Sequence, residues 1–358
     1  MVVAQVSGQP CNLIQMNSMI ASPETVEALP ECAPEIAPLK RSYRDGQRTP
    51  ASVPDHGALE ETLYLIGRPT LKQFLRFAKN NAANPPDEGT LTDEWEAASK
   101  VLGLLEEQEA GAPDNPPITT IEPDSTNEAL LTEFLKDPLV RNSFNTVPTE
   151  LALVELDRLV VYQHHIDLTY CGLLGRELGP SPSDEQIFRT ALLHDHPHPQ
   201  VKWSRARGNQ FVFISRSNDV RFLGAMKLHA RNIVDYAHPG NLAGVIGLAV
   251  GFGSNFLNAV YAENRLILNN GSHRAYVLRK LGVTHVPCII QHVSSRDKLD
   301  VLAASEVMER PDYYLKHPRP SMLKDYFNPK LHKIIQVRPQ LKQITIKFEV
   351  DDVYVPTL

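Results

Sequence analysis

A short polar run, Gly271-Ser272-His273-Arg274, combines a glycine with three side chains that can bind an anion. Before it, Arg265-Leu266-Ile267-Leu268 predicts a short strand, and Asn269-Asn270-Gly271 predicts a tight turn because asparagine and glycine tolerate a positive φ. Ser272 would then open a helix that ends at Gly282, a typical left-handed C-cap. The first amides of such a helix lack intrahelical partners, and its dipole favours negative charge there. The run therefore predicts an anion site, most simply a phosphate site.

Each residue of this site has an expected role in ligand binding. Asn270 and Gly271 would bring the backbone close to the ligand, Ser272 offers a hydroxyl, and His273 offers an imidazole. Arg274 offers a planar fork that matches phosphate oxygens. The same residues also fit a purely structural turn and helix cap, in which Arg274 bonds a nearby carbonyl or carboxylate.

Further candidates lie elsewhere in the sequence. Arg216 and Arg221 flank a strand-to-helix junction, where they could reach the ligand or simply border a helix cap. Gln163 follows the first predicted strand of the second half and could enter the same site. If the site is catalytic, the candidate residues are His273 and two acids that could act as a general base, Glu263 and Asp219.

Metal and thiol sites are not expected. His194, His196 and His198 share one face of an extended segment and could converge on zinc, but the prolines among them favour a surface loop. The four cysteines form no CxxC pair, which argues against a disulfide framework and a zinc-thiolate site and favours a reducing cytoplasm.

The first part of the chain is expected to hold a tail and a small helical region. Seven prolines interrupt residues 1–55, so we expect this tail to be disordered. Residues 56–148 should form three helices, which begin near Pro69, after Thr92 or Asp93, and at about Thr126.

Residues 149–358 alternate between strand and helix patterns, which indicates an α/β (α+β) domain with a C-terminal extension. Strands are expected at 151–161, 211–215, 245–250, 260–268 with a hairpin-like turn at 262–264, 283–290 and 344–350, and helices at 168–178, 183–193 and 220–237. The short helical crossover after Leu268 predicts that the strands at 265–268 and 283–290 are parallel.

The run from Leu268 to Tyr276, with Leu281-Gly282-Val283 and Val286-Pro287 after it, resembles the core signature of the ParB/sulfiredoxin superfamily. The segment from Val154 to Leu159, followed by Gln163, resembles the opening strand of that domain. The resemblance covers residues 258–292 well and 150–292 loosely.

The resemblance implies a ParB/sulfiredoxin-like mixed sheet and a nucleotide-phosphate site at the motif, with ATP or another nucleotide and Mg²⁺ as the expected cofactors. Sulfiredoxins carry their reactive cysteine where this chain has Ser272, so cysteine-sulfinic reduction is not expected. Partition proteins follow the core with a DNA-reading helix-turn-helix, which we do not find after residue 292. Phosphoryl transfer or nucleotide hydrolysis stays open, and the alternative is a non-catalytic interaction or scaffold protein.

Charge is distributed unevenly along the chain. Residues 87–109 carry a net −7 and residues 316–347 a net +7, which indicates two solvated faces, one intramolecular contact, or a surface for a protein partner. The formal net charge of −6 makes nucleic acid an unlikely partner. No apolar run of about 18 residues occurs and Met1 to Ser7 does not resemble a secretory signal, so we expect a soluble cytoplasmic protein.

Overall fold

A computed structural model gives the fold for most of the chain. It describes residues 5–7, 59–68, 70–121, 128–192, 198–217, 219–229, 240–253 and 255–355. Most of the predicted tail lies outside these residues, as do His194 and His196, so neither prediction is tested there. Residues 5–7 are an exception, because they form a strand, β1 (Gln5–Ser7), within the segment predicted to be disordered.

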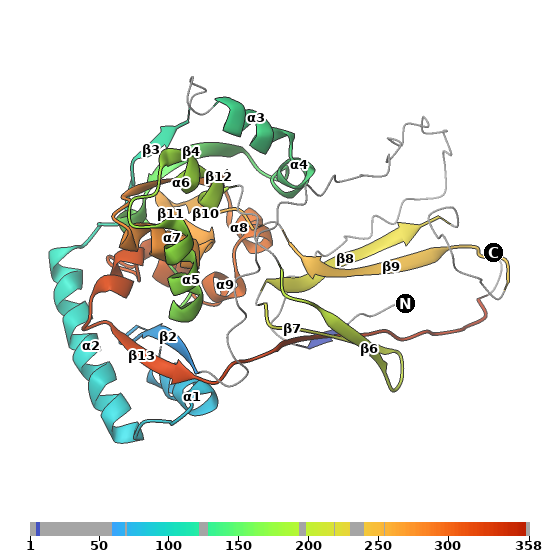
Figure 1. Ribbon diagram of the computed structural model, residues 1–358, viewed down its shortest axis with the longest axis horizontal. Coiled ribbons are helices and arrows are strands. Elements are labelled where there is room, and N and C mark those ends of the chain that lie inside the picture. Colours follow the sequence, from blue (N-terminus) through green and yellow to red (C-terminus); the bar gives the residue numbers. More distant parts are fainter. Residues whose placement is uncertain are drawn as a thin grey trace.

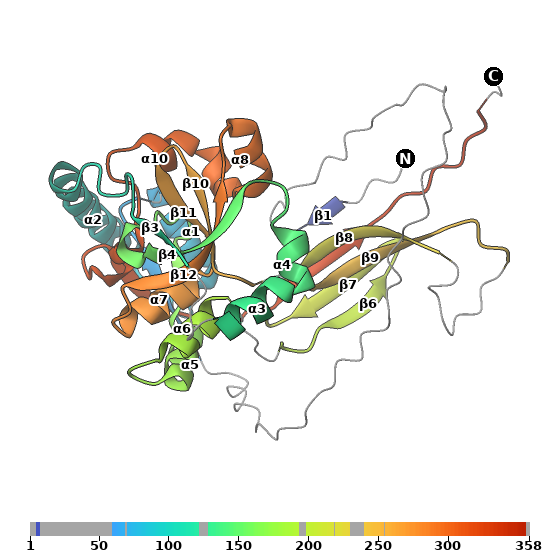
Figure 2. The ribbon, with the colours of Figure 1, turned by 90° about the horizontal axis from the view of Figure 1, so that it is seen from above.

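The described residues form an α+β fold with mixed sheets, which confirms the predicted class. A helical body lies at one side of the molecule, and a group of long strands projects from it, as Figures 1 and 2 show. We call the projecting part the β arm and define it by β6 (Lys202–Ala206), β7 (Gln210–Ser215), β8 (Val220–Leu228), β9 (Val245–Phe252) and β14 (Lys342–Lys347).

The body is built on a five-stranded sheet of order β11-β10-β12-β4-β3. Its strands are β3 (Ile118–Thr120), β4 (Thr149–Glu155), β10 (Asn258–Ala262), β11 (Arg265–Asn270) and β12 (His285–His292). Successive side chains of a strand point to opposite faces, and β11 follows this rule. Leu266 and Leu268 enter the main core, whereas Ile267 enters a second core on the other face.

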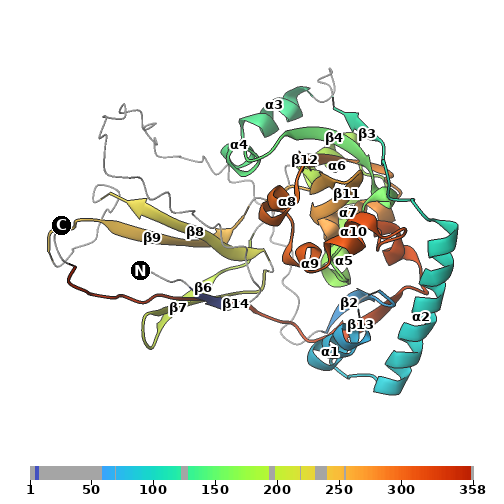
Figure 3. The ribbon, with the colours of Figure 1, turned by 180° about the vertical axis from the view of Figure 1, so that it is seen from behind.

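Two groups of helices cover the two faces of this sheet. The main core packs against α3 (Glu128–Lys136), α4 (Pro138–Ser143), α5 (Leu168–Leu178), α6 (Asp184–Ala191) and α7 (Ser272–Lys280). The other face packs against α8 (Arg296–Leu302), α9 (Ser305–Glu309) and α10 (Pro311–Lys316), which Figure 3 shows from behind. Both faces are therefore apolar, so the strands read as nearly continuous hydrophobic runs.

A smaller layer brings together an early and a late segment of the chain in one sheet. Its sheet has the order β13-β2-β5, with β2 (Glu60–Leu65), β5 (His165–Asp167) and β13 (His332–Val337). Two helices, α1 (Leu71–Asn81) and α2 (Glu88–Gln108), share a core with this sheet. The region predicted as helical thus also contains two strands, β2 and β3. The start predicted for its second helix is wrong, because Asp87 caps α2 several residues earlier.

Two other predictions about secondary structure are wrong. The segment after Asp219 forms β8 rather than a helix, because it pairs along its length with β9. Strands β11 and β12 are not parallel, since β10 lies between them, antiparallel to β11 and parallel to β12. The hairpin turn at Glu263-Asn264 is confirmed, and both of its residues have the positive φ of a two-residue turn.

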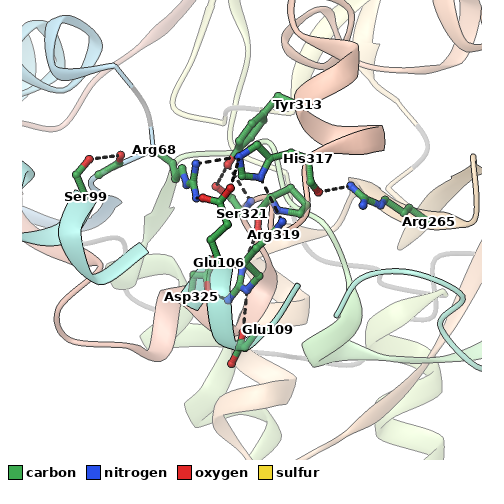
Figure 4. Close-up of polar contacts among 12 residues, drawn as sticks. Arg68, Ser99, Glu106, Glu109, Arg265, Tyr313, His317, Arg319, Ser321 and Asp325 are labelled. Atoms are coloured by element: carbon green, nitrogen blue, oxygen red, sulfur yellow. Dashed lines mark hydrogen bonds and ion pairs between the residues drawn. The ribbon is translucent and has the colours of Figure 1, made fainter. Parts of the chain in front are cut away.

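Ion pairs connect α2 to the segment before β13 (Figure 4). The guanidinium of Arg319 is almost fully buried and binds both oxygens of Asp325, at 3.0 and 2.5 Å, and Glu109 at 2.8 Å. Lys333 contacts Glu94 at 2.6 Å on the same side of the molecule. The acidic and basic segments therefore pair with each other in part, as in the intramolecular contact that was one of the three alternatives.

Replacing Arg319 with alanine should test this contact. The change leaves the buried Asp325 carboxylate without its bidentate partner, so we expect the free energy of unfolding to fall by about 3–5 kcal/mol. Urea denaturation of the full chain measures the change. Arg296→Ala is the matched control, because Arg296 and Asp312 form an exposed pair whose loss should leave the midpoint almost unchanged.

Candidate functional site

The turn before α7 has the geometry that the sequence predicts. Gly271 has a φ of 96°, in the left-handed region, and a Cβ atom there would lie 3.0 Å from the Leu257 side chain. At the other end of α7, the amides of Gly282 and Val283 bond the carbonyls of Arg279 and Leu278, which completes a Schellman motif. Both ends of the helix are thus defined by glycine.

The N-terminus of α7 differs from those of five other helices whose N-caps the structure describes. α1, α2, α5, α6 and α8 begin after a residue whose side chain accepts a hydrogen bond from a helix amide. α7 begins after Gly271 and has no side-chain cap. Its first amides, at residues 272–274, therefore keep donors that an anion can use.

The guanidinium of Arg274 lies inside the protein beside Gly271, with one terminal nitrogen 3.2 Å from the position that a Cβ of Gly271 would occupy. One terminal nitrogen donates to the carbonyls of Thr190 and Ala191, at 3.1 and 2.9 Å, and the other donates to Asn255 Oδ1 at 2.9 Å. The side chain is 2% exposed. Burial lowers the pKa of Arg274 to about 10, so it stays charged at neutral pH. These contacts are those of the structural alternative, in which Arg274 bonds nearby carbonyls, and binding of phosphate by its fork stays a prediction.

His273 is the least satisfied polar residue of the motif. Its Nε2 atom is screened from solvent and has no hydrogen-bond partner among the described residues. The ring meets the Tyr170 ring edge-on, with centroids 5.7 Å apart. Burial lowers the pKa of His273 to about 4, so the imidazole is neutral at pH 7. It can exchange a hydrogen bond with a ligand, but it does not supply a positive charge.

Two of the residues predicted from the 215–221 junction lie near the motif. The Asp219 carboxylate accepts a hydrogen bond from Asn255 at 3.4 Å, and it is close enough to raise the pKa of both His273 and Arg274 against the effect of burial. Arg221 lies close enough to Tyr162 to oppose the rise that burial causes in the pKa of that tyrosine. Tyr162 in turn donates to the Asn269 carbonyl at 2.7 Å, just before the turn.

The other predicted site residues are placed differently. Glu263 sits in the β10–β11 turn, at the opposite end of β11 from Gly271, so the fold does not bring it to the motif. Gln163 folds back on its own strand, with Nε2 donating to the His165 carbonyl at 2.8 Å. Arg216 lies near Glu60, where its charge opposes the rise in the carboxyl pKa that burial causes.

Sequence reasoning missed three residues of this cluster. Asn255 links Arg274 to Asp219, Tyr170 covers His273, and His165 acts electrostatically on His273. His165 comes from β5 and Tyr170 from α5, about a hundred residues before the motif. Only Asn255 carries a local signal, since it follows a glycine-rich turn just before β10.

The two described cysteines are unsuited to thiol chemistry. Burial raises the pKa of the Cys171 thiol to about 12 and raises that of Cys288 even further. Cys171 donates weakly to the His273 carbonyl at 3.7 Å, and Cys288 lies in the sheet. A thiol that stays protonated is a poor nucleophile, so neither residue offers the thiolate that sulfiredoxin-type reduction requires.

In the part of the chain that the structure describes, no three His, Cys, Asp or Glu side chains are grouped to hold a metal ion. None of the described helices is both long and apolar enough to cross a membrane. His198 stacks on Phe252, with ring centroids 3.8 Å apart. Comparison with known proteins finds no match to a protein-family model, a curated protein or a solved structure.

Replacing Arg274 with alanine should lower the stability of the whole protein and not only its affinity for a ligand. The change removes a buried charged donor that serves three oxygens and leaves the Ala191 carbonyl with only its bond from the Leu257 amide, so we expect a loss of about 3–5 kcal/mol in the free energy of unfolding. Arg279→Ala, on the exposed side of the same helix, should cost clearly less. Equal losses for the two variants in urea denaturation would contradict the assignment.

Buried histidines should make stability depend on pH. Burial lowers the pKa of both His164 and His273 from an ordinary 6.5 to about 4, so the unfolded chain binds protons first as the pH falls. The free energy of unfolding should therefore decrease between pH 6.5 and 4, by at most about 1.4 kcal/mol per pH unit for each histidine. In denaturation curves recorded across this range, His164→Gln and His273→Gln should each flatten the slope. An unchanged slope in both variants would show that other groups cause it.

Proposed function

We propose that the protein binds a phosphate-bearing ligand, with a nucleotide as the leading class, at the N-terminus of α7. One observation carries the proposal: α7 starts without a side-chain cap at a left-handed glycine, and its first turn holds a buried histidine nitrogen that has no hydrogen-bond partner among the described residues. Both features favour an acceptor-rich, negatively charged group at the same place.

The roles of the motif residues differ from those expected from the sequence. The backbone amides at 272–274 hold the phosphate, and His273 Nε2 donates to it as a neutral imidazole. Arg274 holds α7 in position through its buried hydrogen bonds and does not contact the ligand. We expect Arg221, whose Nε atom donates to the Asp219 carbonyl at 3.2 Å, to supply the cation that meets the ligand.

The proposal is of binding, and the structure supports catalysis less well. Asp219 is the predicted acid that lies near His273, since Glu263 is at the far end of β11. Magnesium commonly binds through one or two carboxylates together with the phosphates of a nucleotide. Asp219 fits that arrangement, and a bound magnesium ion would neutralise part of the phosphate charge. The resemblance to the ParB/sulfiredoxin superfamily supports the same ligand class and remains a proposal.

Titration calorimetry of the full chain with ATP, CTP and inorganic pyrophosphate, each with and without magnesium, tests the site. Arg221→Ala should weaken binding at least tenfold, because a charged hydrogen bond contributes about 1.5–3 kcal/mol. Lys227→Ala is the control, since Lys227 is an exposed base of the same strand. Equal affinities for the two variants, or no binding of any of the three ligands by the folded protein, would overturn the proposal.

A bound phosphate should also raise the pKa of His273 from about 4. Binding would then take up a proton, so affinity should increase as the pH falls from 7 toward 5. Calorimetry in two buffers of different ionisation enthalpy measures the uptake, and His273→Gln corrects for protonation of the phosphate itself. If the variant takes up as many protons as the natural chain, His273 does not contact the ligand.

A further inference from the structure

The segment after β14 is an extended chain without a strand partner. Phe348 makes the last backbone hydrogen bond of this region that joins it to another segment, from its amide to the Asn209 carbonyl at 3.0 Å. We call residues 349–355 the C-terminal tail; its sequence, Glu-Val-Asp-Asp-Val-Tyr-Val, has three acids and no base. Val350, Val353 and Val355 are largely exposed, and Tyr354 is fully exposed. β-branched and aromatic residues of this kind favour a strand.

The β arm also has a sheet edge whose chemistry complements the tail. Its sheet has the order β1-β14-β7-β6, so β6 pairs with β7 on one side only. Residues 202–207, which we call the basic edge, contain Lys202, Arg205 and Arg207 and no acid. Trp203 is 65% exposed there, although its ring stacks on Phe213. Among the described residues, none of these three bases forms an ion pair.

We propose that the protein forms a dimer in which the C-terminal tail of each copy adds a strand to the basic edge of the other. An unpaired strand edge readily accepts another chain through its backbone groups. The opposite charges of the two segments, three acids against three bases, favour this pairing. The exchange is reciprocal, so two identical contacts close a symmetric dimer.

The side chains specify one antiparallel register. Placing Asp351 opposite Arg205 puts Glu349 opposite Arg207 and Val353 opposite Trp203 on the same face. On the other face, Asp352 then lies opposite Ser204 and Tyr354 opposite Lys202. Every acid of the tail meets a base or a hydroxyl, and the exposed tryptophan is covered by an apolar residue.

The direction of the strands favours a second copy over the chain's own edge. β6 and β14 are both antiparallel to β7, so they run the same way, and the tail leaves the sheet at the end where β6 turns into β7. Figure 2 shows the C-terminal trace continuing away from the arm. To pair antiparallel with its own β6, the chain would have to reverse directly after Phe348. The edge of a second copy related by a two-fold axis can approach in the required direction.

Charge-swap variants test the dimer and distinguish it from a folded-back monomer. The mass of the full chain in solution, measured by light scattering at several concentrations and at low and high salt, should rise from 40.0 kDa to twice that value. Arg205→Glu and Asp351→Arg should each weaken dimerisation at least tenfold when alone. Mixed together they should dimerise again, because each tail then meets an edge of opposite charge. Lys227→Glu, an exposed base on β8, should leave the dimer intact.

The other outcomes overturn the proposal. A monomer at every concentration in low salt means that the tail does not bind a second copy. A dimer that survives both single variants uses another surface. If the double variant Arg205→Glu/Asp351→Arg recovers thermal stability while the mixture of single variants gains neither stability nor mass, the tail pairs within its own chain.

Discussion

The guanidinium group of Arg274 connects the body to the base of the β arm. Arg274 projects from α7 and bonds the carbonyls of Thr190 and Ala191, where α6 ends, and the side chain of Asn255, where the chain returns to β10. The segments that form β6 to β9 lie between those two points in the sequence. The arginine thus bonds the residues just before β6 and just after β9 to α7, the helix that carries the candidate site. Its burial and three hydrogen bonds make it a structural residue in the middle of a motif that looks like a ligand site.

This arrangement connects the candidate site to the arm. Asn255 also donates to Asp219, which begins the path into β8, so a single polar chain runs from α7 to the base of the arm. A ligand at the helix N-terminus would lie beside that chain. The buried His273 carries no charge at pH 7, and Asp219 and Arg274 both lie within electrostatic reach of it.

The sequence predicts the local features of this fold and fails where distant segments decide the outcome. The turn at Gly271, the helix to Lys280 and the hairpin at Glu263-Asn264 were predictable, because glycine and asparagine in a left-handed conformation define them. The strand β8 was not, since sixteen residues separate it from its partner β9. The same limit applies to Arg274. Its type and its position at a helix start suggest a phosphate ligand, whereas the structure shows that it donates hydrogen bonds to carbonyls at the end of α6.

Two strand pairings have consequences for the rate of folding. β13 pairs with β2, near the start of the described body, and β14 pairs with β7 in the arm. Both pairings join segments that lie far apart in the sequence, so the entropy of closing a long loop opposes each of them. Contacts of this kind slow folding, and until they form β2 and β7 each lack one neighbouring strand.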